Sequence, residues 1–135
     1  MQASGGCHCG AIRYSISGDP VYHALCHCSD CRKASGAPAV SWALFPRGAV
    51  KVEGNPSVYA SSVLAQRHFC GTCGTSLFYA NETAFPGMID VQSATLDDPG
   101  ALPLQLEVQT MERISWMPAA DTPQFERFPS RANRV

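Results

Sequence analysis

Cys70-Gly71-Thr72-Cys73-Gly74 is a CxxC motif followed by glycine, and Cys7-His8-Cys9-Gly10 is a CxC motif that also ends in glycine. Glycine allows the unusual backbone angles of a tight turn, so that two sulfur atoms can point at one metal ion. Two such pairs supply the four thiolates of a closed, tetrahedral zinc site. We therefore predict a structural zinc ion that ties the start of the chain to its middle and is bound by Cys7, Cys9, Cys70 and Cys73.

The other three cysteines form a third motif, Cys26-His27-Cys28-Ser29-Asp30-Cys31. Three protein ligands with one open position are typical of a catalytic zinc ion. We therefore predict a second zinc ion, making two per chain, with the ligands Cys26, Cys28 and Cys31. Other assignments stay open: Cys28 as a free thiol, or His8 or His27 as a further ligand. All seven cysteines would then serve only the fold if a histidine closed the second site.

The chain as a whole is typical of one globular domain. It has 135 residues, of which 45% are hydrophobic and 16% charged, enough to build a core. An odd number of cysteines argues against a complete set of disulfide bonds. We see no signal peptide and no membrane-spanning segment, so we expect a reducing, cytoplasmic location. The net charge of -1 argues against nucleic acid or a membrane surface as partner.

Short alternating or apolar segments, separated by Gly and Pro, predict a mostly β fold made of small sheets. The predicted strands are residues 11–17, 40–45, 50–52, 58–60, 66–69, 76–79, 88–91 and 104–108. One brief helix is expected from about Ser29 to Ser35. We place a zinc domain at residues 1–126 and a polar C-terminal tail at residues 127–135. The tail, or an exposed strand edge, is a candidate contact for a homodimer.

The predicted open site favours a sulfur ligand. A zinc ion with three thiolates is a weaker Lewis acid than one with three histidines, and it suits a further thiol. A thiol bound there would ionise well below its usual pKa of about 8.5. We therefore expect the site to hold a small thiol as its thiolate, which attacks a small electrophile such as an aldehyde. The thiolate must leave the metal at least in part before it attacks.

Charged residues beside the triad are candidates for substrate contacts. Arg32 and Lys33 can pair with substrate carboxylates, and Asp30 can carry a proton. As the alternative, all three are solvated charges on a short turn. His27 is a candidate acid, base or ligand, or a half-exposed histidine without a chemical role. Pocket and core positions are both open for Trp42 and Phe45, whereas His23 and His68 are candidates for packing or for hydrogen bonds that support the metal ligands.

Three segments around these motifs resemble the glutathione-dependent formaldehyde-activating enzyme (GFA) family, also called the centromere protein V (CENP-V) domain family. They are Gly6–Tyr14, Cys26–Gly36 and Arg67–Leu77, with shorter matches at residues 94–99 and 121–125. The resemblance implies an Mss4-like fold with a structural and a catalytic zinc ion, on the same four and three cysteines as above. It also implies carbon–sulfur lyase activity, the formation and breakdown of S-hydroxymethylglutathione from formaldehyde and glutathione.

The late strand departs from the family. Leu104-Gln105-Leu106-Glu107 stands where the family often has a histidine and an aromatic residue, so the substrate can differ from formaldehyde. Two other functions stay open from the sequence. The chain can be a non-catalytic zinc-binding module, or a thiol redox enzyme in which the triad supplies the reactive cysteine.

Overall fold

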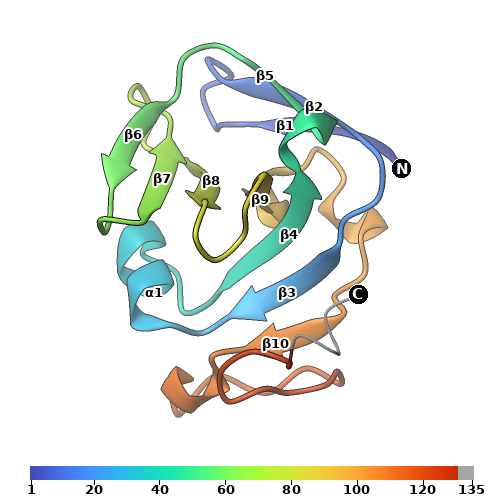
Figure 1. Ribbon diagram of the computed structural model, residues 1–135, viewed down its shortest axis with the longest axis vertical. Coiled ribbons are helices and arrows are strands. Elements are labelled where there is room, and N and C mark those ends of the chain that lie inside the picture. Colours follow the sequence, from blue (N-terminus) through green and yellow to red (C-terminus); the bar gives the residue numbers. More distant parts are fainter. Residues whose placement is uncertain (131–135) are drawn as a thin grey trace.

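The computed structural model describes residues 1–130, which form ten strands, one α-helix and four short 3₁₀ turns (Figure 1). The strands are β1 (Gln2–Gly6), β2 (Arg13–Ser17), β3 (Tyr22–Cys26), β4 (Val40–Pro46), β5 (Val50–Glu53), β6 (Ser57–Ala60), β7 (Ala65–Phe69), β8 (Ser76–Asn81), β9 (Met88–Gln92) and β10 (Leu106–Val108). The helix is α1 (Ser29–Ser35), and the 3₁₀ turns are Arg47–Ala49, Ser93–Thr95, Pro99–Ala101 and Thr110–Glu112. The predicted mostly β fold is confirmed.

Two sheets make up the molecule. The small sheet has the order β1-β2-β5, and the large sheet has the order β10-β3-β4-β9-β8-β7-β6. All neighbours are antiparallel except β10, which runs parallel to β3. Figure 1 shows the large sheet curling round, with the small sheet lying across one end and α1 joining β3 to β4. The curl brings the start of α1 and the strands β7 and β8 to the same side of the molecule.

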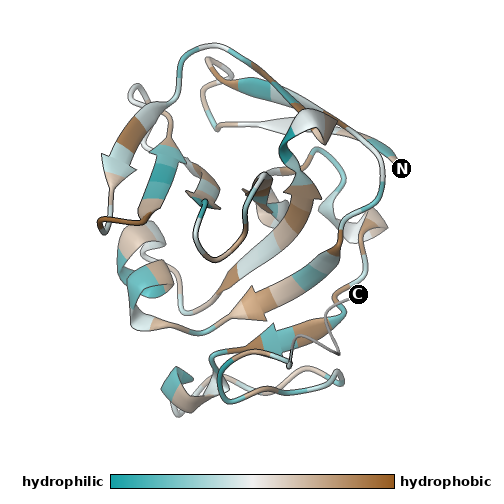
Figure 2. Cartoon of the chain, viewed as in Figure 1, coloured by the Kyte–Doolittle hydropathy of each residue, from teal (hydrophilic) through white to brown (hydrophobic). Residues whose placement is uncertain are grey.

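The two sheets enclose the main hydrophobic core. On β2, Tyr14 and Ile16 are buried and Ser15 and Ser17 are exposed, which is the period-2 pattern of a half-buried strand. β4 lies in the middle of the large sheet and is buried along most of its length, and Figure 2 shows hydrophobic residues concentrated on it. A second, smaller core surrounds the cysteine triad and consists of Ala24, Cys26, Cys31, Val40, Trp42 and Val108.

Each predicted strand overlaps an observed one, and the helix has the predicted bounds. Two observed strands, β1 and β3, were absent from the prediction. β1 reads Gln-Ala-Ser-Gly-Gly, and such small residues have low strand propensity. It forms because its glycines admit close neighbours: a Cβ at Gly5 would collide with Tyr14 and with the carbonyl of Thr95. β3 is a short inner strand without alternation, and it is paired on both sides.

The predicted tail begins within the packed part of the chain. Arg127 Nη1 donates to Gln109 Oε1 and to Glu112 Oε2, both at 2.7 Å. The predicted boundary at residue 126 stays a prediction, and residues 131–135 of the tail lie outside the described residues. In residues 1–130 no helix combines the length and apolar character needed to cross a membrane.

Candidate metal centres and the adjoining cavity

The first cysteine cluster brings together the CxC and CxxC motifs. The sulfur atoms of Cys7, Cys9, Cys70 and Cys73 all lie within 4.8 Å of one another. Cys9 Sγ is 3.6 Å from Cys7 Sγ and 3.8 Å from Cys70 Sγ. A tetrahedral zinc ion with bonds of about 2.3 Å requires sulfur–sulfur edges of about 3.8 Å. The predicted four residues therefore meet, and their spacing fits a metal ion such as zinc.

Both motifs are shaped as tight turns that aim amides at sulfur. Gly10 and Gly74 each have φ of +83°, a left-handed conformation that glycine adopts without strain. The amide of Ile12 donates to Cys7 Sγ at 3.2 Å, and that of Cys73 donates to Cys70 Sγ at 3.5 Å. Such amide donors stabilise thiolates in a metal site.

Thr75 links the two turns of the first cluster. Its hydroxyl oxygen accepts from the amide of His8 at 3.1 Å and lies 3.2 Å from Cys73 Sγ. The side chain and backbone of Thr75 are the main reason that the pKa of Cys73 is lowered to about 5. Cys73 therefore favours the thiolate at neutral pH, the form in which a cysteine binds zinc.

The second cluster lies where β3 ends and α1 begins. The sulfur atoms of Cys26, Cys28 and Cys31 lie within 4.8 Å of one another, and the group has no fourth His, Cys, Asp or Glu member among residues 1–130. Cys28 is the N-cap of α1, where its sulfur accepts from the Cys31 amide at 3.3 Å. The helix of seven residues ends after about two turns because Gly36 is left-handed, with φ of +73°. The short helix thus serves to present two of the three sulfurs.

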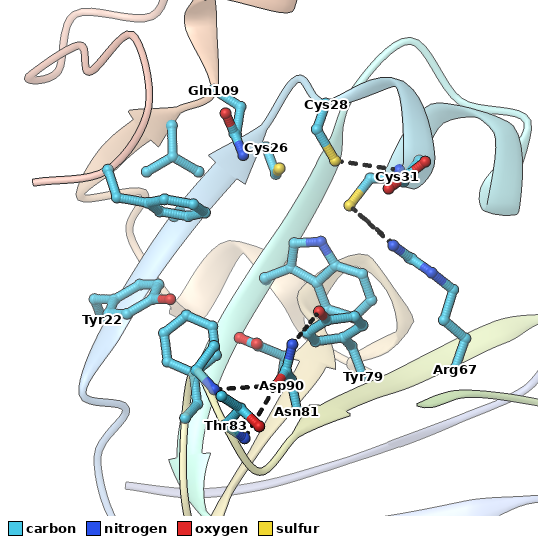
Figure 3. A pocket seen from close by; sticks show the side chains of 17 residues that line it. Tyr22, Cys26, Cys28, Cys31, Arg67, Tyr79, Asn81, Thr83, Asp90 and Gln109 are labelled. Atoms are coloured by element: carbon cyan, nitrogen blue, oxygen red, sulfur yellow. Dashed lines mark hydrogen bonds between the residues drawn. The ribbon is translucent and has the colours of Figure 1, made fainter. Parts of the chain in front are cut away.

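Arg67 on β7 neutralises part of the charge of this cluster. Its Nη1 and Nη2 atoms lie 3.9 and 3.8 Å from Cys31 Sγ, as Figure 3 shows. The side chain is only 7% exposed, and its guanidinium lies 5.0 Å from the centre of the Tyr79 ring. Hydrogen bonds with Cys26 and Cys28, opposed by burial and aided by the charge of Arg67, lower the pKa of Cys31 to about 3.

A cavity of about 470 Å³ opens beside the second cluster. This volume lies within the range of small-molecule sites. All three cysteines of the triad line it, and Figure 3 shows them at one end, with Gln109 beside Cys26. Its walls carry aromatic side chains from several strands, namely Tyr22, Trp42, Tyr79, Phe85 and Phe128.

A carboxyl group lies deep in this cavity. Asp90 on β9 lines it, is 5% exposed, and its Oδ1 has no hydrogen-bond partner among the described residues. Burial raises the pKa of Asp90 to about 7, because a carboxylate loses its hydration there. Buried polar groups are ordinarily paired, so this one marks a candidate for ligand contact.

His27, between two triad cysteines, is not part of the group of converging sulfur atoms. It has no exposed surface, and its Nε2 lies 2.7 Å from Glu107 Oε1. The interpretation of a half-exposed histidine is therefore wrong: the partner, Glu107, lies 80 residues further along the chain. Its Nε2 is engaged by that carboxylate rather than by a metal ion.

The other predicted site residues divide between two surfaces. Asp30 and Trp42 line the cavity of the triad. Arg32 and Lys33 line a separate hollow together with Ile114 and Trp116, so their predicted contact with substrate stays a prediction.

Phe45, His23 and His68 belong to the packing of the domain. Phe45 is fully buried in the main core. His23 bonds to Ser93 Oγ and to the carbonyl of Pro103, at 2.7 and 3.0 Å. His68 packs edge-on against Phe78.

Arg67, Asp90 and Gln109 were not among the candidates from sequence. Arg67 and Asp90 each left a signal there, because both are charged residues within predicted strands. A charged side chain on the inner face of a strand needs a partner or a function. Gln109 has φ of +54°, unusual for a residue other than glycine, and no sequence pattern indicates this.

The curled β fold and the two cysteine clusters define a small mostly β protein with two candidate metal centres. The sequence profile described as glutathione-dependent formaldehyde-activating enzyme matches residues 2–112. The chain therefore belongs to the GFA family, as its motifs predicted.

Individual relatives agree with this membership. An uncharacterized lyase of Schizosaccharomyces pombe is 34% identical over 76 residues, which are 56% of each chain. A protein of Halomonas elongata, named putative glutathione-dependent formaldehyde-activating enzyme, is 28% identical over 72% of this chain and 67% of its own. The matches thus span about half to two thirds of these relatives.

A solved structure supports the fold. The crystal structure of a Rhodobacter sphaeroides protein aligns with a TM-score of 0.56 and 26% identity, over 76% of this chain and 99% of that one. Most of that protein is therefore matched, whereas about a quarter of this chain lies outside the alignment.

Proposed function

We propose that this protein is a zinc-dependent carbon–sulfur lyase that acts on a glutathione adduct, forming or breaking S-hydroxymethylglutathione or a related small thiol adduct. The observation that carries the proposal is the convergence of three cysteine sulfurs at one end of a cavity. The names of the relatives and the family support glutathione as the thiol and a lyase as the class.

The donor set of the second cluster fits zinc. Three sulfurs within 4.8 Å of one another leave a fourth corner of a tetrahedron to a ligand from the cavity. A zinc ion held by Cys26, Cys28 and Cys31 would supply positive charge that favours the thiolate form of a bound thiol. The first cluster, in this proposal, holds a structural zinc ion.

The residues of the chain have separate tasks in the proposed reaction. In the forming direction the thiol sulfur bonds to the aldehyde carbon, the C=O double bond becomes a single bond, and the thiol proton ends on oxygen. Asp30 lines the cavity and is our candidate for carrying that proton. The guanidinium of Arg67, beside Cys31, offsets the negative charge of the sulfurs.

In this proposal Arg32 and Lys33 bind the carboxylates of glutathione. Both residues line the hollow that also includes Ser29 and Trp116. A substrate in the triad cavity would have to extend past α1 to reach them. The cytoplasmic location expected from the sequence fits the reduced thiols that both centres need.

Zinc content and glutathione binding test the function together. We expect about two zinc ions per chain in the parent protein and about one in Cys28→Ser. Serine is a suitable control replacement because its hydroxyl keeps the N-cap acceptor for the Cys31 amide. Isothermal titration should show glutathione binding to the parent and much weaker binding to Cys28→Ser.

Activity needs a rate measurement, because thiols add to formaldehyde without a catalyst. Exchange spectroscopy on S-hydroxymethylglutathione should show faster breakdown with the parent protein than with Cys28→Ser. A parent with two zinc ions and no affinity for small thiols would favour a non-catalytic zinc module. One zinc ion and three titratable thiols would favour redox chemistry at the triad.

A further inference from the structure

The unpaired carboxyl of Asp90 lies in the same cavity as the cysteine triad but at a different level of the sheet. We propose that Asp90 binds the cationic amino group of the thiol substrate, which in glutathione is the γ-glutamyl amine. The inference rests on the proposed function and names the residue that selects an amine-bearing thiol.

Strand register gives the position of Asp90 relative to the triad. Asp90 pairs with Leu44 on β4, whereas Cys26 pairs with Val40 on the same strand. A row here means the residues that pair with one another across neighbouring strands. The row of Asp90 and the row of Cys26 are four residues apart along β4, about 13 Å at 3.3 Å per residue. In Figure 3 Asp90 lies beside Asn81 and Tyr79, away from the three sulfurs.

This separation excludes Asp90 from direct proton exchange at the reacting sulfur, which requires hydrogen-bond distance or one bridging water. It fits instead the remote end of a tripeptide substrate. From sulfur to γ-glutamyl amine, extended glutathione spans roughly 10 Å, about three residues of chain at 3.3–3.6 Å each. A thiol held at the triad can thus place its amine near Asp90.

The surroundings of Asp90 favour a cation over a neutral group. Tyr79 pairs directly with Asp90, and Tyr22 lies in the same row beyond Leu44; both rings line the cavity. Aromatic faces attract an ammonium group, and a buried carboxylate gains most from a charged partner.

Among the described residues that line the cavity, only Arg67 carries a full positive charge, and its guanidinium does not contact Asp90. Arg67 belongs to the same row, since it pairs with Tyr79, but its guanidinium is directed to Cys31 Sγ and lies over the Tyr79 ring. The Asp90 Oδ1 atom has no protein partner among residues 1–130. A ligand ammonium would supply the missing charge and hydrogen bonds.

The role of Asp90 is tested by measuring the affinities of two ligands for two proteins, the parent and Asp90→Asn. Isothermal titration compares glutathione with its deamino analogue, which lacks only the γ-glutamyl amine, on zinc-loaded parent and Asp90→Asn. We expect the parent to bind glutathione about 10- to 100-fold more tightly than the analogue, as a charge-assisted hydrogen bond in a buried site allows. Asp90→Asn should bind the two ligands about equally.

Asp98→Asn is the matched control, because Asp98 is exposed and is not part of the cavity lining. It should discriminate the two ligands as the parent does. Equal affinities of the parent for both ligands would overturn the role of Asp90 while leaving thiol binding at the triad intact. Failure of the parent to bind either tripeptide would overturn the proposed function and this inference with it.

Discussion

His27 and Glu107 form a fully buried pair whose Nε2 and Oε1 atoms lie 2.7 Å apart. The pair fastens the middle of the triad motif to β10. The second carboxylate oxygen of Glu107, Oε2, accepts from the amide of Ala120 at 2.8 Å and from the side chain of Gln124. One carboxylate therefore joins the triad loop to the C-terminal segment of the domain.

Truncation of Glu107 should destabilise the protein more than its conversion to an amide. Glu107→Ala leaves the buried His27 without its partner and removes the acceptor of the Ala120 amide, at an expected cost of about 3 kcal/mol in the free energy of unfolding. Glu107→Gln keeps the size and one acceptor oxygen and should cost less. Guanidinium unfolding of both variants measures this, and equal stabilities of parent and Glu107→Ala would contradict it.

Local patterns in the sequence were enough to predict most strands and both cysteine clusters. The geometry of a CxxC-Gly turn is set by a few neighbouring residues. Two cysteine pairs of this kind are typical of one four-thiolate zinc site, so the meeting of Cys7, Cys9, Cys70 and Cys73 could be predicted from the motifs. The His27–Glu107 pair could not be predicted in this way. It depends on the parallel pairing of β10 with β3, a long-range contact with no local signal.

The left-handed glycines of the first cluster should resist substitution. At Gly74, where φ is +83°, a Cβ would meet nothing within 4 Å, so backbone strain alone opposes alanine. We expect Gly74→Ala to lower the free energy of unfolding by roughly 1–2 kcal/mol. Gly48→Ala is the control, since that site has equal space and no positive φ, and it should change stability little. Similar losses in both variants would show that conformation at Gly74 is not the cause.

Arg67 should matter for the second metal centre and not for the first. Arg67→Met keeps an apolar stem against Tyr79 but removes the positive charge beside Cys31. We expect zinc affinity at the triad to fall about 10- to 100-fold, the usual effect of losing a residue that supports a metal ligand. Competition with a chelator measures both sites. Arg47→Met, which removes an exposed pair with Glu82, should leave both affinities unchanged, and an equal effect of the two variants would refute the role.

Arg67 and Asp90 also mark the limit of prediction within the site. The candidate metal ligands lie close together in the sequence, in short motifs. The residues that line the cavity come from separate strands, among them β3, β4, β7, β8 and β9. Which charged residue in a strand faces inward depends on register and on the curl of the sheet. The single row that joins Arg67, Tyr79 and Asp90 became visible only when the strand order was known.

Asp90 should make stability depend on pH in a defined direction. Its pKa is raised from 3.8 to about 7 by burial, so the folded protein holds a proton that the unfolded chain has lost between these values. The free energy of unfolding of the parent, relative to Asp90→Asn, should therefore decrease as the pH rises from 5 to 7, by roughly 1.4 kcal/mol per pH unit. Above pH 7 the difference should level off, because Asp90 is then ionised in both states. Guanidinium unfolding of both zinc-loaded proteins from pH 5 to 8 measures the difference, in which titration of the shared metal ligands cancels. A difference that does not change with pH would mean that Asp90 ionises normally in the folded protein.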